Sequence, residues 1–103
     1  MKFKLIYSLA ICLFLVSNVY SDEMYNLGKE VFLNNGNCAS CHTLSDANSM
    51  ANVGPNLNLI KPDFGRVVNS VTNGIGVMPS MLGILSEKEI KAVAYYVSEA
   101  SMN

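Results

Sequence analysis

The chain has 103 residues and a formal net charge of −1, with seven Lys and Arg against eight Asp and Glu. This composition offers no basic patch, so nucleic acid is not an expected partner. The length allows one domain, and a domain of this size is marginal unless a disulfide, a metal or a bound cofactor adds to its core.

The first 21 residues have the organisation of a secretory signal peptide. Lys2 and Lys4 precede an apolar run over residues 5–16, and Val19 and Ser21 offer small residues where signal peptidase cleaves. The run is shorter than the roughly 20 residues that a membrane-spanning helix needs. We therefore expect a signal peptide over residues 1–21, a single domain over residues 22–103 exported to the periplasm, and no stable membrane anchor after cleavage.

Three segments of the exported domain have the periodicity of amphipathic helices. The first begins near Asp22 and stops at Asn35-Gly36, and its apolar stripe is Met24, Leu27, Gly28, Val31 and Phe32. The second begins near Pro62-Asp63 and ends at Asn73-Gly74, although its valines would also suit a strand. The third opens with the capping box Ser86 to Glu89 and buries Ile90, Val93, Ala94 and Val97.

Residues 43–58 and 74–85 connect these helices and are rich in Gly, Pro, Asn and Ser. No segment alternates between apolar and polar residues with period two, so no pair of strands is expected. The sequence therefore predicts an all-α domain.

The segment Cys38-Ala-Ser-Cys41-His42 contains the only histidine of the chain. C-x-x-C-H is the pattern of covalent haem attachment: two thiols on one turn can add to two vinyl groups of a porphyrin, and the next imidazole can bind its iron. A thioredoxin-like pair would need a βαβ context, and a structural zinc site about four ligands. A disulfide between residues this close would stabilise little.

An iron bound by one histidine has a sixth position, and its ligand separates electron carriers from enzymes and gas binders. With one histidine in the chain, methionine is the remaining good candidate. Met78 and Met81 both lie in the Gly-rich loop 74–85. We favour Met78, because Pro79 stiffens the loop after it and Gly76 lets the backbone pass close to a ring; Met81 remains the alternative.

Residues 27–98 resemble the class I c-type cytochromes, in particular the small bacterial monohaem forms. The resemblance rests on the haem-attachment segment and on four further features, which are Gly28 with Phe32, Gly54-Pro55-Asn56-Leu57, Gly76-Val77-Met78-Pro79, and Leu85 to Ile90 with Tyr96. It implies a cytochrome c fold, in which the N- and C-terminal helices cross, a short helix lies between them and loops enclose the haem.

The resemblance also implies roles for individual residues. Gly28 and Phe32 would pack against Val93 and Tyr96 where the terminal helices cross. Pro55 would offer its carbonyl to the His42 ring, and Met81 would shield the haem edge. The cofactor would be one haem c, attached through Cys38 and Cys41, with His42 and Met78 as axial ligands of its iron.

The function implied is single-electron transfer in a respiratory chain, without enzymatic activity. We expect a monomer that docks transiently, at the haem edge, with redox proteins as donor and acceptor. The alternative is a haem c electron-acceptor subunit of a periplasmic dehydrogenase, such as a sulfite-oxidising molybdenum enzyme. A haem enzyme or gas sensor would need an open sixth position.

Overall fold

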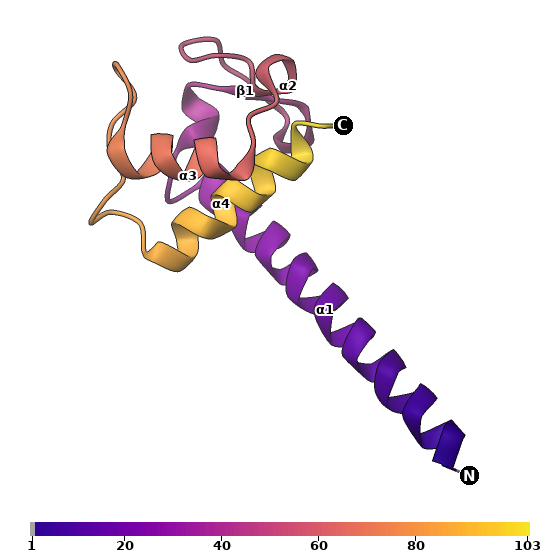
Figure 1. Ribbon diagram of the computed structural model, residues 1–103. Helices are drawn as coiled ribbons and strands as arrows, with labels where there is room; N and C mark the ends of the chain where they lie inside the picture. The colour runs from indigo at the N-terminus through magenta and orange to yellow at the C-terminus, as the bar shows by residue number, and fades with distance from the viewer. Residues whose placement is uncertain (1) are drawn as a thin grey trace.

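The computed structural model describes residues 2–103, with side chains from Asn18 onward. Three long helices dominate it: α1 (Lys2–Leu33), α3 (Phe64–Asn73) and α4 (Glu87–Ala100) (Figure 1). A short helix α2 (Leu57–Ile60) and two 3-10 turns, Cys38–Ser40 and Ser45–Ala47, lie in the connection between α1 and α3. The predicted second and third helices are confirmed within one residue, and the mainly helical fold is confirmed.

Helix α1 begins much earlier than predicted. It runs without a break from Lys2, rather than from Asp22, and its first half extends away from the domain (Figure 1). The sequence between Ser17 and Leu27 contains no Gly or Pro that would interrupt a helix. The signal-peptide prediction depends on the side chains of residues 2–16, which lie outside those described. Among the residues that the structure describes, no helix has the length and apolar character needed to cross a membrane.

Two short strands correct the prediction that no strand pair exists. Strand β1 (Thr43–Leu44) pairs antiparallel with β2 (Ser49–Met50), with Thr43 opposite Met50 and Leu44 opposite Ser49. A strand of two residues cannot show a period of two, so the sequence pattern gave no signal. Helix α2 was likewise missed; Asn56 caps it by accepting hydrogen bonds from the backbone N–H groups of Asn58 and Leu59.

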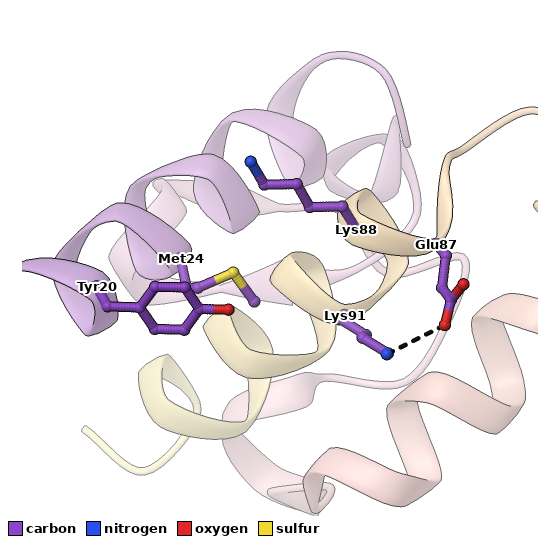
Figure 2. A pocket seen from close by; sticks show the side chains of 5 residues that line it. All are labelled: Tyr20, Met24, Glu87, Lys88 and Lys91. Carbon is purple, nitrogen blue, oxygen red and sulfur yellow. Dashed lines mark ion pairs between the residues drawn. The ribbon is translucent and has the colours of Figure 1, made fainter. Parts of the chain in front are cut away.

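An open cleft of about 360 Å³ lies where α1 passes the first turns of α4. Tyr20 and Met24 of α1 line it on one side, and Glu87, Lys88 and Lys91 of α4 on the other (Figure 2). Lys91 forms an exposed ion pair with Glu87, one helical turn away, at 3.1 Å. Because Tyr20 belongs to the predicted signal peptide, cleavage after Ser21 would remove Tyr20 from this cleft and leave Met24 as its lining residue on α1.

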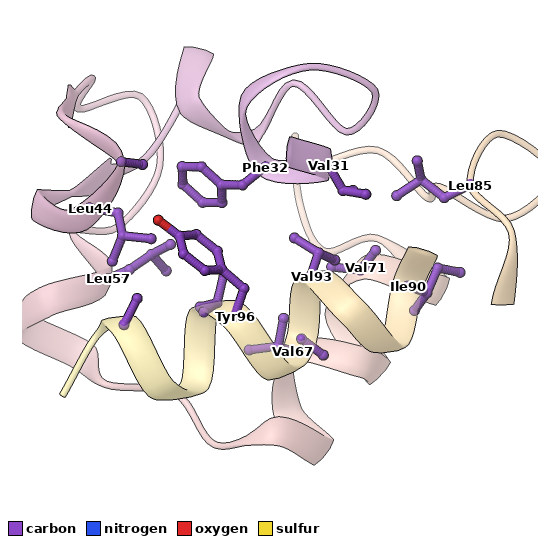
Figure 3. Packing of buried hydrophobic residues seen from close by; sticks show 14 residues of the cluster. Val31, Phe32, Leu44, Leu57, Val67, Val71, Leu85, Ile90, Val93 and Tyr96 are labelled. Atoms are coloured by element: carbon purple, nitrogen blue, oxygen red, sulfur yellow. The ribbon is translucent and has the colours of Figure 1, made fainter. Parts of the chain in front are cut away.

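The core forms where α1 crosses α4. Tyr96 is fully buried, and its ring packs edge-on against Phe32, with a centroid separation of 5.8 Å (Figure 3). The Tyr25 ring also packs edge-on against Tyr96, with a centroid separation of 4.9 Å. A Cβ atom added to Gly28 would lie 2.1 Å from the Ala92 carbonyl oxygen and 2.5 Å from Tyr96 Cβ. The predicted crossing is therefore confirmed, with the backbone of Ala92 as the closest neighbour of Gly28.

The remaining core residues complete this packing. All four residues predicted to form the buried face of α4 are buried, and α3 packs against the same helix. The capping box is also present: Ser86 Oγ accepts from the Glu89 N–H at 3.1 Å, and the Glu89 carboxylate accepts from the Ser86 N–H at 3.0 Å.

Replacing Gly28 by alanine should destabilise the protein strongly. The added methyl group would collide with the backbone of α4, which cannot rotate away as a side chain could. Overpacking of this kind costs about 1–3 kcal/mol in the free energy of unfolding, and we expect the upper end. Denaturant unfolding would measure it, with Gly65→Ala as the control, because a methyl group at Gly65 meets only one atom, at 3.7 Å. Equal stabilities of the two variants would contradict the close crossing.

Asp46 connects the loop after His42 to both crossing helices. Its carboxylate accepts a hydrogen bond from the Tyr96 hydroxyl at 2.7 Å and lies 3.4 Å from Lys29 Nζ. The Tyr96 hydrogen bond, together with Tyr25 and Lys29, lowers the pKa of Asp46, against the opposing effect of partial burial. The charged form of Asp46 is therefore the form that the fold stabilises.

The lowered pKa of Asp46 predicts a pH dependence. A carboxyl group with a lowered pKa contributes stability above its unfolded pKa of about 3.9, and this contribution is lost as the pH falls through the folded pKa. Asp46→Asn should lower the free energy of unfolding at pH 7 by about 1–3 kcal/mol and flatten its fall in acid. Urea titrations between neutral and acid pH would measure this; parallel curves for variant and wild type would contradict it.

Candidate haem-binding site

The end of α1 leads directly into the turn that carries the two cysteines. The chain leaves α1 through Gly36, whose N–H donates to the Val31 carbonyl at 2.7 Å, and through Asn37, which has a left-handed φ of 52°. The Cys38 carbonyl then accepts from the N–H groups of Cys41 and His42, at 3.1 Å and 3.0 Å. One tight turn therefore holds both thiols and the imidazole of the motif.

Both cysteines are free thiols and both are half-buried. Burial raises the pKa of the Cys38 thiol to about 11, and the nearby Cys41 acts in the same direction while a backbone hydrogen bond opposes it. The Cys38 side chain is therefore a neutral thiol at neutral pH. Among the side chains that the structure describes, no group of three or more His, Cys, Asp or Glu could hold a metal ion, which gives the zinc alternative no support.

The His42 ring is fixed by the loop that carries Gly54 and Pro55. His42 Nδ1 lies 2.8 Å from the Pro55 carbonyl oxygen, which can only accept, so Nδ1 carries the proton of this hydrogen bond. The Gly54 N–H donates to the Cys41 carbonyl at 2.7 Å. With Nδ1 protonated, Nε2 of the neutral ring keeps its lone pair and is free to bind a metal.

Gly54 has a role that sequence reasoning missed. A Cβ atom on this residue would lie 2.6 Å from Cε1 and 3.1 Å from Nε2 of His42, so the imidazole rests against the bare backbone. The signal was available in the Gly54-Pro55 pair, but only the proline was given a role. Pro55 and Gly54 thus act together, one holding the ring by a hydrogen bond and the other leaving room for it.

The structure places Met78 and Met81 in the separate loop after α3. Both side chains are half-buried and pack against the core. Two backbone hydrogen bonds join Met78 to Ile75: the N–H of each residue donates to the carbonyl of the other at 3.0 Å. The left-handed Gly76, at φ 57°, makes the tight turn between them.

These residues fit the demands of a covalently bound haem. Two thiols lie on one turn, an oriented imidazole follows them, and a thioether lies in a backbone-anchored loop. Large exposed apolar side chains suited to a porphyrin surface lie in the connecting loops, in α2 and at the start of α3: Val53, Leu59, Phe64, Ile75, Val77, Leu82 and Ile84. The cleft lined by Tyr20 and Met24 contains none of the motif residues and plays no part in this site.

Comparison with known proteins decides the family. Residues 23–97 match the family described as cytochrome C oxidase, cbb3-type, subunit III. The chain belongs to the class I c-type cytochromes. Its structure is similar to the crystal structure of the c-type cytochrome SorU from Sinorhizobium meliloti, with a TM-score of 0.74 and 50% identity, covering 78% of this chain and 93% of that one.

Two cytochromes c6 are also similar to the chain. The cytochrome is 46% identical over 81 residues to chloroplastic cytochrome c6 of Chlamydomonas reinhardtii, covering 69% of this chain and 51% of that protein's length. It is 40% identical over 81 residues to cytochrome c6 of Chlorolobion braunii, with 69% and 84% covered. The match thus spans about half the length of the first relative and most of the second. Membership of the family implies one covalently bound haem c with its iron.

Proposed function

We propose that the cytochrome is a periplasmic single-electron carrier. Its haem c would be attached through Cys38 and Cys41, and its iron would be bound by His42 and Met78. The observation that carries this proposal is the hydrogen bond between His42 Nδ1 and the Pro55 carbonyl, at 2.8 Å. It orients Nε2 as a metal ligand on the same turn as the two thiols.

Each residue of the site has a definite task. The Cys38 and Cys41 thiols would hold the haem, each through one thioether bond made by adding its S–H across one vinyl group. The Pro55 carbonyl raises the basicity of His42 by accepting its proton in a hydrogen bond. Met78 supplies a thioether, which favours ferrous iron and raises the potential. When bound, the haem iron supplies reversible one-electron chemistry.

An iron held by both His42 and Met78 would favour a carrier over an enzyme. Neither His42 nor Met78 changes its charge with the iron, so neither has to leave when an electron arrives. Substrates and gases would then find no vacant position on the iron. Support for an electron carrier comes from the cytochrome c6 relatives and from the structural similarity to SorU, which is itself a c-type cytochrome.

The proposed periplasmic location rests on the predicted signal peptide, and the proposed partners on the charge that its cleavage would leave. Cleavage after Ser21 would leave five Lys and Arg against eight Asp and Glu. Gly28, Phe32 and their contacts with α4 lie after that position, so the helix crossing would remain. The small negative charge favours transient docking with redox proteins that present a basic surface.

An optical redox titration of purified holoprotein tests the proposed function. We expect a reversible one-electron transition and fast electron exchange with a basic redox partner, slowing modestly as salt is added. Ferrous holoprotein that binds carbon monoxide readily would contradict the carrier, because the sixth position would then be open. Isolation from its host in a fixed-stoichiometry complex with a dehydrogenase would support the subunit alternative instead.

A further inference from the structure

The loop that contains Met78 also completes the C-terminal end of α3. The last four carbonyl groups of an α-helix have no partner within the helix. Three of these carbonyls in α3 accept hydrogen bonds from residues beyond the helix: Ser70 from Gly74 N–H at 2.8 Å, Val71 from Met81 N–H at 2.8 Å, and Thr72 from Ser80 Oγ at 2.5 Å. The end of α3 and residues 74–85, which we call the methionine loop, are therefore joined by hydrogen bonds.

Ser80 is the side chain that makes this connection. Its hydroxyl donates to the Thr72 carbonyl and accepts from the Leu82 N–H at 3.2 Å, so it links the helix, the loop and the turn that follows. A serine hydroxyl has one hydrogen to donate, and here that hydrogen is used on the helix. Ser80 is exposed, so its contribution comes from these hydrogen bonds rather than from apolar burial.

The backbone of Met78 lies between two anchors. Toward the N-terminus it is paired with Ile75: the Met78 N–H donates to the Ile75 carbonyl and the Met78 carbonyl accepts from the Ile75 N–H, both at 3.0 Å. On its C-terminal side Pro79 has no N–H to donate, so the next anchor is Ser80. A Cβ atom on Gly74 would lie 2.8 Å from both the Met78 carbonyl oxygen and the Ser80 nitrogen, so this segment rests directly against the end of α3.

We propose that Ser80 is a positioning residue for the sixth iron ligand. Its hydroxyl ties the C-terminal side of Met78 to α3 and so limits how far the Met78 thioether can withdraw from the iron. This inference rests on the proposed function, in which Met78 is that ligand. A serine that only capped α3 would support the fold without affecting the iron.

The consequence is a change in how often Met78 leaves the iron. An exogenous ligand binds only while Met78 is displaced, so its apparent affinity is proportional to the displaced fraction. Losing one hydrogen bond that acts only in the attached state should raise this fraction about two- to tenfold. The apparent Kd of imidazole for ferric holoprotein should fall by the same factor.

Imidazole titrations of four ferric holoproteins test the proposal: wild type, Ser80→Ala, Ser80→Thr and Ser98→Ala. Ser98 is the matched control, because its hydroxyl donates to the Tyr95 carbonyl at 3.0 Å on α4, outside the methionine loop. We expect Ser80→Ala to bind imidazole two- to tenfold more tightly than wild type, and Ser80→Thr, which keeps the hydroxyl, to return toward wild type. Ser98→Ala should bind imidazole as wild type does. Urea unfolding, measured in parallel, should show that both alanine variants remain folded.

Each other outcome has a definite meaning. If Ser80→Ala binds imidazole as wild type does, while Met78→Ala binds it much more tightly, the positioning role is wrong and the proposed ligand stands. If Ser98→Ala matches Ser80→Ala, the effect reflects general stability and the positioning role is again wrong. If wild type already binds imidazole as tightly as Met78→Ala, Met78 is not the ligand and both proposals fail.

Discussion

Met78→Ala should convert the cytochrome from a closed electron carrier into a haem protein with an accessible iron. Loss of the thioether should remove the far-red sulfur-to-iron charge-transfer band, lower the reduction potential, and allow carbon monoxide to bind the ferrous iron and cyanide the ferric iron. The covalent haem should remain, because the turn holding Cys38 and His42 is separate from the methionine loop. Optical spectra with and without these ligands would measure the change.

Met81→Ala is the matched control, because both methionines are half-buried against the core. The hydrogen bond from the Met81 N–H to the Val71 carbonyl does not involve the Met81 side chain, so it should remain in this variant. We expect an unchanged far-red band and a loss of about 2 kcal/mol or less in the free energy of unfolding, since Met81 is only partly buried. The reverse pattern would identify Met81 as the ligand, and an unchanged spectrum in both variants would exclude both Met78 and Met81.

Removing either thiol should have the second large effect. Cys38→Ala or Cys41→Ala leaves one thioether at most, so the yield of holoprotein should fall sharply in both variants. Denatured wild type should keep its haem on the polypeptide in a gel. Ser40→Ala, between the two cysteines, is a suitable control. Ser40 Oγ donates to the Asn37 carbonyl at 2.7 Å and lies 3.7 Å from Cys41 Sγ, but it supplies no thiol, so it should be dispensable for attachment.

The outcome that contradicts covalent attachment is equally clear. If acidified acetone extracts the haem from wild type, no thioether bond exists. If both single-cysteine variants assemble as much stable holoprotein as wild type, the two thiols are not the attachment points. A normal yield from Ser40→Ala is needed in the same experiment, because it shows that the turn tolerates a substitution.

Much of the fold could be predicted because its signals are local. Helices α3 and α4 follow from capping residues and from apolar spacing, and Asp63 and Ser86 cap them as expected. The crossing of α1 and α4 followed from the family resemblance. The two-residue strands, the four-residue α2 and the early start of α1 were missed. The first two are too short to create periodicity, and nothing in the sequence before Asp22 stops the helix.

In the candidate site, too, some residues could be predicted from local sequence and others could not. Cys38, Cys41 and His42 are adjacent in sequence, so their spacing alone indicates the chemistry. The packing of the His42 ring against Gly54 and the hydrogen bond from Ser80 to Thr72 depend on contacts between separate segments, which no local spacing in the sequence indicates. Asp46 is similar, since its partner Tyr96 lies 50 positions away along the chain. Such contacts become visible only when the loops are placed in space.

The most direct test of the account is NMR spectroscopy of the reduced holoprotein with isotope-labelled methionine methyl groups. A methyl group on a sulfur bound to haem iron lies over the porphyrin, whose ring current shifts its resonance far upfield. We predict one such resonance in wild type, retained in Met81→Ala and lost in Met78→Ala. A wild-type spectrum without an upfield methionine methyl, or one in which the resonance survives Met78→Ala, would contradict the proposed ligation of the iron.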